Sequence, residues 1–177
     1  AAAAPPKLEE SLVGQRVHKY EIVRLVGRGG MGSVFEAVNT AIGKRVAMKF
    51  VDAALARNKD AIARFHREAQ AASAVESAHI VEIFDSGFTD DDVPYIVMEL
   101  LRGEDLGHRL KRCGRLSLDE ALHVTAQILR GLHRAHREGI VHRDLKPDNV
   151  FLLDRDDDPS FVKILDFGIS KFDQGRT

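Results

Sequence analysis

A cluster of glycines stands between two segments that have the alternation of β-strands, and this pattern constrains the fold more than any other. The cluster runs from Gly27 to Gly32 and fits the spacing G-x-G-x-x-G. β-Branched residues are frequent before it, over 20–28, and apolar and polar residues alternate after it, over 33–38. The pattern therefore predicts a strand–loop–strand hairpin rather than a strand–loop–helix unit.

The glycine spacing leaves two other interpretations open. Glycines let a backbone approach phosphate oxygens and direct amide hydrogens at them. Dinucleotide-binding folds use the same spacing and place an acid about 20 residues later, where Asp52 stands. That fold needs a helix after the loop, which the alternation after Gly32 does not favour. A plain glycine-rich hairpin turn is the remaining alternative, and the loop alone does not exclude it.

The other predicted elements mix short strands with amphipathic helices. Strands are expected over residues 44–51, 79–88, 94–100, 150–153 and 161–165. Helices are expected over residues 58–75, over residues 104–112 and from Ser117 to Gly139. Ser117 and Glu120 form a capping box at the start of the last helix, and Gly139 ends it. Its buried stripe is predicted to contain Leu118, Leu122, Leu129 and Leu132.

Lys49 lies in an apolar predicted strand, on the same face as Ala47. A buried ammonium group needs a partner. Glu68 is the candidate, because it stands beside the apolar stripe of the helix predicted over 58–75. The alternatives are a lysine exposed at an edge and a glutamate in solvent.

The most specific signal is the segment HRDLKPDN over residues 142–149. Asp144 can accept a proton from a hydroxyl group, and Lys146 can neutralise a transferring phosphoryl group. Asn149 can ligate a divalent cation through its amide oxygen. Asp166, in the DFG triplet that follows the last strand, adds the carboxylate that magnesium prefers. His142 is expected to support this loop rather than take part in the chemistry.

These motifs together resemble those of eukaryotic-like (Hanks-type) bacterial serine/threonine protein kinases. The resemblance covers residues 20–171 and implies an α+β, protein-kinase-like fold. It implies an antiparallel five-stranded small lobe with one helix, followed by the first part of a mainly helical large lobe. The implied domains are an N-terminal tether over 1–14, the small lobe over 15–101, and a partial large lobe over 102–177 that ends in the activation loop.

By that resemblance, the chain uses ATP and Mg²⁺ and transfers a phosphoryl group to a protein hydroxyl. Asp144 is the catalytic base, and Lys146 contacts the γ-phosphate and indicates Ser/Thr rather than Tyr acceptors. Asn149 and Asp166 hold Mg²⁺. The implied ATP-binding residues come from the glycine loop, the adenine pocket, the Lys49–Glu68 pair and the hinge. They are Leu25, Gly27, Gly29, Gly32, Val34, Ala47, Lys49, Glu68, Met98, Glu99, Leu101 and Phe151.

Composition argues against several other classes of protein. The 26 basic and 27 acidic residues nearly balance, which is not typical of a nucleic-acid or membrane-surface binder. One cysteine excludes an internal disulfide framework, and no apolar run is long enough to cross a bilayer. A cytoplasmic setting is expected, with a membrane anchor beyond this chain left open. The expected partner is a protein substrate with Ser or Thr, and a kinase–kinase dimer is also left open.

The resemblance ends with the chain at Thr177, whereas the family continues through an A-P-E motif and further helices. One interpretation is therefore a kinase whose catalytic domain is incomplete here, truncated after the DFG motif. The alternative is a non-catalytic nucleotide-binding or interaction fragment. A downstream A-P-E motif would support the first interpretation, and a stop codon after Thr177 would support the second.

We expect residues 1–177 alone not to phosphorylate a protein substrate at a useful rate. Catalytic groups must be held within a fraction of an ångström, and the Asp144 loop would lack the helices that support it. The measurement is transfer of radiolabelled phosphate by purified 1–177, beside a longer chain that extends through the rest of the domain. Comparable turnover by the two proteins would contradict the expectation.

Overall fold

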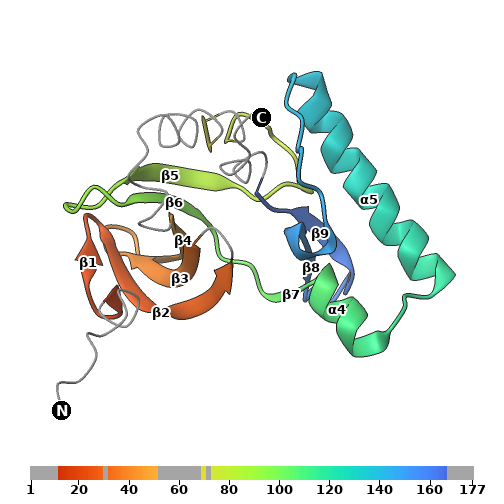
Figure 1. The fold of residues 1–177 in the computed structure, drawn as a ribbon, viewed down its shortest axis with the longest axis horizontal. Helices are drawn as coiled ribbons and strands as arrows, with labels where there is room; N and C mark the ends of the chain where they lie inside the picture. The colour runs from red at the N-terminus through yellow and green to blue at the C-terminus, as the bar shows by residue number, and fades with distance from the viewer. Residues whose placement is uncertain (1–11, 30–31, 52–68, 71–72, 167–177) are drawn as a thin grey trace, which may run out of the picture. The chain divides into compact units, whose positions relative to one another are not determined.

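The chain divides into two units, each assembled from segments that are distant in sequence. The structure, a computed structural model, describes residues 12–29, 32–51, 69–70 and 73–166 (Figure 1). The first unit comprises residues 1–62 and 84–100, and the second comprises residues 63–83 and 101–177. Residues 63–83 thus belong to the second unit. The predicted lobes, over 15–101 and 102–177, placed this segment in the small lobe instead.

The first unit contains a six-stranded sheet in the order β1-β2-β3-β4-β6-β5 (Figure 1). Its strands are β1 (Arg16–Val17), β2 (Tyr20–Gly29), β3 (Gly32–Asn39), β4 (Lys44–Val51), β5 (Ile83–Phe88) and β6 (Pro94–Glu99). The predicted antiparallel hairpin around the glycine cluster is confirmed, because β2 and β3 pair up to Gly29 and Gly32. The five predicted strands are joined at the edge by β1, whose two residues are too few to show an alternation.

The two faces of this sheet differ in what they bury. Residues paired across neighbouring strands share a face. The pairs Leu25–Phe35, Phe35–Met48 and Met48–Val97 lie on the face that forms the hydrophobic core of the unit. Phe35, Met48 and Val97 are fully buried there. The intervening residues of the same strands therefore form the opposite face, which carries Lys49.

The second unit combines a three-stranded sheet, in the order β7-β8-β9, with two helices (Figure 1). The elements are β7 (Gly103–Asp105), α4 (Leu106–Cys113), α5 (Leu118–Arg137), the 3₁₀ helix η1 (Pro147–Asn149), β8 (Val150–Leu153) and β9 (Phe161–Ile164). The helix predicted to start at Glu104 starts instead at Leu106, because Asp105 caps it: its carboxylate accepts from His108 N at 2.8 Å. The strand predicted from His79 begins at Ile83, and Ile80 makes only a single parallel bridge to Ile164.

Helix α5 has the predicted ends but a different buried face. Ser117 Oγ accepts from Glu120 N at 3.2 Å, and Gly139 takes a left-handed φ of 74° just beyond the helix. The residues buried on α5 are Val124, Gln127, Gly131 and Ala135. The predicted buried stripe is wrong for Leu118, Leu122 and Leu129, which are 74%, 60% and 60% exposed; Leu132 packs against the core. The core face has small residues because the helix approaches β9 closely.

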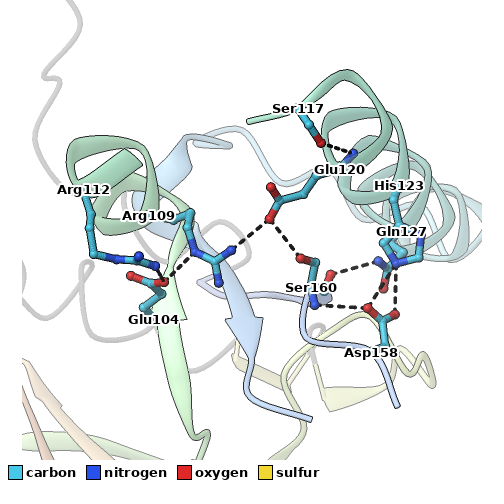
Figure 2. A network of polar contacts seen from close by, with 9 residues as sticks. All are labelled: Glu104, Arg109, Arg112, Ser117, Glu120, His123, Gln127, Asp158 and Ser160. Carbon is cyan, nitrogen blue, oxygen red and sulfur yellow. Dashed lines mark hydrogen bonds and ion pairs between the residues drawn. The ribbon is translucent and has the colours of Figure 1, made fainter. Parts of the chain in front are cut away.

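A network of polar contacts joins α4, α5 and the segment before β9 (Figure 2). Arg109 donates from Nε to Glu104 Oε1 at 2.5 Å and from Nη1 to Glu120 Oε1 at 2.9 Å. Ser160 Oγ donates to the same Glu120 oxygen at 3.1 Å. Hydrogen bonds from Arg112 and Arg109 hold the pKa of Glu104 below its ordinary value. The network fixes both helices to the sheet of the second unit.

Part of the predicted structure lies outside the described residues. The helix predicted over 58–75 falls mostly there, and so does most of the N-terminal tether over 1–14. Two residues of the predicted helix stripe are described, Ala69 and Val75, and both are buried.

A partly buried carboxyl group, that of Asp85, should make the stability of the first unit depend on pH in the acid range. Asp85 Oδ2 accepts from Tyr20 Oη at 3.0 Å and lies 3.0 Å from Lys19 Nζ. Burial opposes ionisation, but the hydrogen bonds from Lys19 and Tyr20 outweigh it and lower the pKa of Asp85. The stabilisation is therefore present above the unfolded-state pKa of about 3.9 and is lost as pH falls through the lower folded pKa.

We expect Asp85→Asn to flatten the dependence of the unfolding free energy on pH in the acid range. Urea unfolding followed by circular dichroism between pH 2 and 7, about the range where carboxyl groups titrate, measures this slope. Asp91→Asn, at an exposed position between β5 and β6, is the control and should leave the slope unchanged. An equal slope for Asp85→Asn and the parent protein would contradict the assignment.

Candidate active site

The loop over residues 142–149 brings three of the predicted site residues together in the second unit. Lys146 Nζ lies 3.3 Å from Asp144 Oδ2. Asn149 Nδ2 donates to the Asp144 carbonyl oxygen at 2.9 Å and lies 3.3 Å from Asp144 Oδ2. Pro147 opens the short helix η1 that ends at Asn149. The carboxylate of Asp144 is therefore oriented by a cation and an amide within its own loop.

Asn149 and Asp166 fit a site for a divalent cation. Because Asn149 Nδ2 donates to Asp144, its Oδ1 is left to accept, and the side chain is almost fully buried. Leu165 N donates to the Asn149 carbonyl oxygen at 2.9 Å. This hydrogen bond holds Asp166, the residue after Leu165, close to Asn149. Magnesium usually takes one or two protein oxygens and completes its shell with phosphates and waters. Among the described residues, no group of three or more His, Cys, Asp or Glu is placed to hold a metal ion.

His142 supports this loop, as expected from the sequence. Its Nε2 lies 2.7 Å from the Leu165 carbonyl oxygen, and Asp144 N donates to its Nδ1 at 3.3 Å. A carbonyl oxygen only accepts, so Nε2 is the donor of the hydrogen bond to Leu165. The buried ring thus joins the loop of Asp144 to the residue before Asp166.

Two residues of these motifs have left-handed backbones. Arg143 has φ 62° and Asp166 has φ 53°. Non-glycine residues adopt this region infrequently, and such conformations concentrate at functional sites. His142 forms hydrogen bonds with Asp144, which follows Arg143, and with Leu165, which precedes Asp166. These hydrogen bonds hold the two turns in place.

In the first unit the sheet gathers the predicted phosphate- and adenine-binding residues on one face. Lys49 pairs with Val34 on β3 and with Ile96 on β6, and Ala47 pairs with Met98. Lys49 lies on an interior strand of the sheet and is only 7% exposed, so the alternative of an edge lysine is wrong. Glu68 lies outside the described residues, and its pairing with Lys49 remains a prediction.

Leu25 is not brought together with these residues. It pairs with Phe35 and packs against the hydrophobic core, on the face opposite to Val34 and Ala47. A β-bulge between Leu25 and Gly27 shifts the register, and strand alternation puts Val26 on the face of Val34. Val26 is 46% exposed. Strand alternation alone does not reveal a bulge and therefore does not indicate Val26, although the place of this residue directly before the first glycine is a signal.

The remaining predicted residues are divided between the two units. Gly27 pairs with Val34, and Gly29 pairs with Gly32 at the end of the hairpin. At Gly32 a Cβ would lie 1.9 Å from the Phe50 carbonyl oxygen and φ is 144°, so only glycine fits. Glu99 ends β6 in the first unit. Leu101 and Phe151 belong to the second unit, where Phe151 pairs with Asp105 and Lys163.

The motifs and the fold can be compared with those of known proteins. The family model described as protein kinase domain matches residues 20–177. The chain belongs to this family. The kinase domain is 42% identical over 163 residues to serine/threonine-protein kinase Pkn1 of Myxococcus xanthus, covering 92% of this chain and 23% of that protein. It is 39% identical over 160 residues to serine/threonine-protein kinase PrkC of Bacillus subtilis, covering 90% of this chain and 24% of that protein.

Solved structures share the fold of this kinase domain. The crystal structure of the PknI kinase domain of Mycobacterium tuberculosis superposes with a TM-score of 0.79 at 30% identity. The match covers 90% of this chain and 63% of that chain. The chain thus spans about a quarter of the two relatives named above and less than two thirds of this crystallised domain. Among the described residues of the kinase domain, no helix is both long and apolar enough to span a membrane.

Leu25 and Val26 are neighbours in the chain but lie on opposite faces of the sheet. This difference gives a test of which face is the one predicted to bind the nucleotide. We expect Val26→Ala to weaken ATP binding by about threefold to tenfold, since it removes two carbons of apolar contact. Its effect on the unfolding free energy should be small because Val26 is half exposed. Leu25→Ala should do the reverse, and it should destabilise the fold by about 1–2 kcal/mol, less than a fully buried leucine.

Calorimetric titration with ATP and urea unfolding of the same two variants separate these effects. If Leu25→Ala weakened ATP binding more than Val26→Ala at equal stability, the assignment of the two faces would be wrong.

Proposed function

We propose that the chain carries the phosphoryl-transfer chemistry of a protein kinase, from Mg–ATP to a Ser or Thr hydroxyl of a protein substrate. The observation that carries the proposal is the arrangement around Asp144, whose carboxylate has Lys146 at 3.3 Å and Asn149 beside it. A carboxylate next to a cation and an amide N–H donor can receive a hydroxyl proton while charge is neutralised nearby. The relatives named serine/threonine-protein kinases support this interpretation.

Each residue has a role that follows from its surroundings. Asp144 accepts the proton of the substrate hydroxyl, and Lys146 neutralises charge that develops on the transferred phosphoryl group. Asn149 Oδ1 and the Asp166 carboxylate hold the magnesium ion. When bound, this ion supplies charge neutralisation of the phosphates.

The sheet of the first unit supplies the surface for the nucleotide. Val34, Ala47, Met98 and, in place of Leu25, Val26 line the adenine, because they share the face of the sheet opposite to the hydrophobic core. Lys49, buried on the same face, binds the phosphates. Its pairing with Glu68 remains a prediction from the sequence. The glycine loop from Gly27 to Gly32 covers the phosphates with its backbone amides.

Other expectations remain part of the proposal. Glu99 and Leu101 supply the hinge contacts to the adenine edge, and Phe151 supplies a further apolar contact to the adenine. The protein substrate carries a Ser or Thr acceptor. A cytoplasmic setting and a kinase–kinase dimer remain predictions from the sequence.

The division of roles between two aspartates can be tested in the intact protein. We expect Asp144→Asn to reduce phosphoryl transfer by about 10²–10⁴-fold, the range for loss of a general base, while sparing ATP affinity. Asp166→Asn should instead weaken Mg–ATP binding, because it removes a metal ligand. Both residues keep their shape in these variants, so the fold is expected to survive.

The measurements are radiolabelled phosphate transfer and calorimetric titration with Mg–ATP. The assignment would be wrong if the two substitutions damaged nucleotide binding equally. Asp91→Asn, at an exposed turn, is the matched control and should change neither quantity.

A further inference from the structure

Gly131 stands in the middle of α5, on the buried face of the helix. Glycine in a helix interior costs about 0.5–1 kcal/mol relative to alanine, so a structural reason for it is expected. A Cβ at this position would lie 2.9 Å from Ile164 Cδ1 and 3.2 Å from the His79 carbonyl oxygen. Both contacts are closer than a side chain normally tolerates. The absence of a side chain therefore allows α5 to approach β9 and residue 79 at one point.

The Cδ1 atom of Ile164 has little room to turn away from this contact, because the side chain is fully buried. The backbone of Ile164 is also held on both sides. Its N–H donates to the His79 carbonyl oxygen at 2.9 Å, and its carbonyl oxygen accepts from Val81 N at 3.0 Å. On the other side it pairs with Val150 of β8. The side chain is fully buried in the core of the second unit.

Helix α5 is also fixed along its length, so it cannot slide to relieve a clash. One turn before Gly131, Gln127 donates from Nε2 to the Ser160 carbonyl oxygen at 3.0 Å and accepts at Oε1 from Val162 N at 3.0 Å. Figure 2 shows Gln127 beside Ser160, with His123 and Asp158 next to them. Less than one turn after Gly131, Arg134 Nε donates to the Glu76 carbonyl oxygen at 3.3 Å.

The contact lies two residues before the proposed metal ligand. After Ile164 the chain continues to Leu165, whose N–H donates to the Asn149 carbonyl oxygen and whose carbonyl oxygen accepts from His142 Nε2. Asp166 follows directly. A shift of Ile164 would therefore be transmitted to the separation of Asp166 and Asn149, since these hydrogen bonds leave the intervening backbone little freedom.

We propose that Gly131 is a positioning residue for magnesium-bound nucleotide: by admitting Ile164 and His79 against α5, it fixes Asp166 relative to Asn149. The inference rests on the function proposed above for those two residues. Gly131 touches neither nucleotide nor metal, and it acts only through Ile164. Outer-shell changes of this kind commonly cost 10–100-fold in metal affinity.

The test uses Gly131→Ala in the intact protein, with Mg²⁺ dependence of ATP binding as the readout. We expect the Mg²⁺ concentration needed for half-maximal ATP binding to rise about tenfold. Adding Ile164→Val removes the Cδ1 atom that the new Cβ would meet, and it should recover at least about half of this loss on a logarithmic scale. Hydrogen exchange at Val81 N–H should be faster in Gly131→Ala and return towards the parent rate in the double variant.

Two controls separate positioning from general damage. Ala126→Gly weakens α5 by about 1 kcal/mol at an exposed position and should leave the Mg²⁺ dependence unchanged. Ile164→Val alone gives the baseline for the double variant. Parent-like Mg²⁺ dependence in Gly131→Ala would overturn the proposal, and so would a loss that Ile164→Val leaves unrelieved or an equal loss in Ala126→Gly. Failure of the parent protein to bind Mg–ATP would instead refute the proposed function.

Discussion

The backbone pairing of Ile164 with two segments at once organises the second unit. On one side stands Val150, which follows the loop of Asp144 directly through Asn149. On the other side are His79 and Val81, more than 80 residues earlier in the chain. Every residue proposed to act on phosphate or metal in this unit lies within a few positions of these paired segments. These residues lie in turns that are anchored at their ends to a small sheet, and rigid elements of this kind hold the geometry of a site well.

The first unit depends on the separation of apolar and charged side chains between the two faces of one sheet. The core face is apolar, whereas the opposite face contains two buried charged side chains, Lys49 and Glu36. Glu36 is 1% exposed and is held by Arg24 at 2.6 Å and Arg45 at 2.5 Å. A buried carboxylate requires such partners. Charge is thus placed where the nucleotide is proposed to bind and is kept away from the core.

Local sequence patterns predicted most strands and helices. They did not predict which face of an element is buried where contacts with distant parts of the chain decide it. Alternation and β-branched residues gave the strands around the glycine cluster, and the Ser117 cap and Gly139 gave the ends of α5. The order of residues within the loop over 142–149 was enough to predict that Asp144, Lys146 and Asn149 lie together, because their contacts are local. The side of Leu25 was not predictable, since a bulge shifts the register. The prediction of the buried face of α5 was also wrong. The leucines of the helix favour one stripe as the buried one, whereas the close approach to Ile164 requires the stripe that contains Gly131 and Ala135.

The division of the chain into units has a consequence for its synthesis. The chain passes between the units three times, and β5 and β6 emerge from the ribosome before β9 exists. The carbonyl oxygen of Ile80 accepts a hydrogen bond from Lys163, which is synthesised 83 residues later. At a synthesis rate of roughly 5–20 residues per second, this interval lasts several seconds. During that time the first unit can close its sheet while Val75, Ile80 and Val81 still lack the strand that buries them. Until β9 has been synthesised, these apolar residues of the nascent chain are therefore open to chaperones and to misassociation.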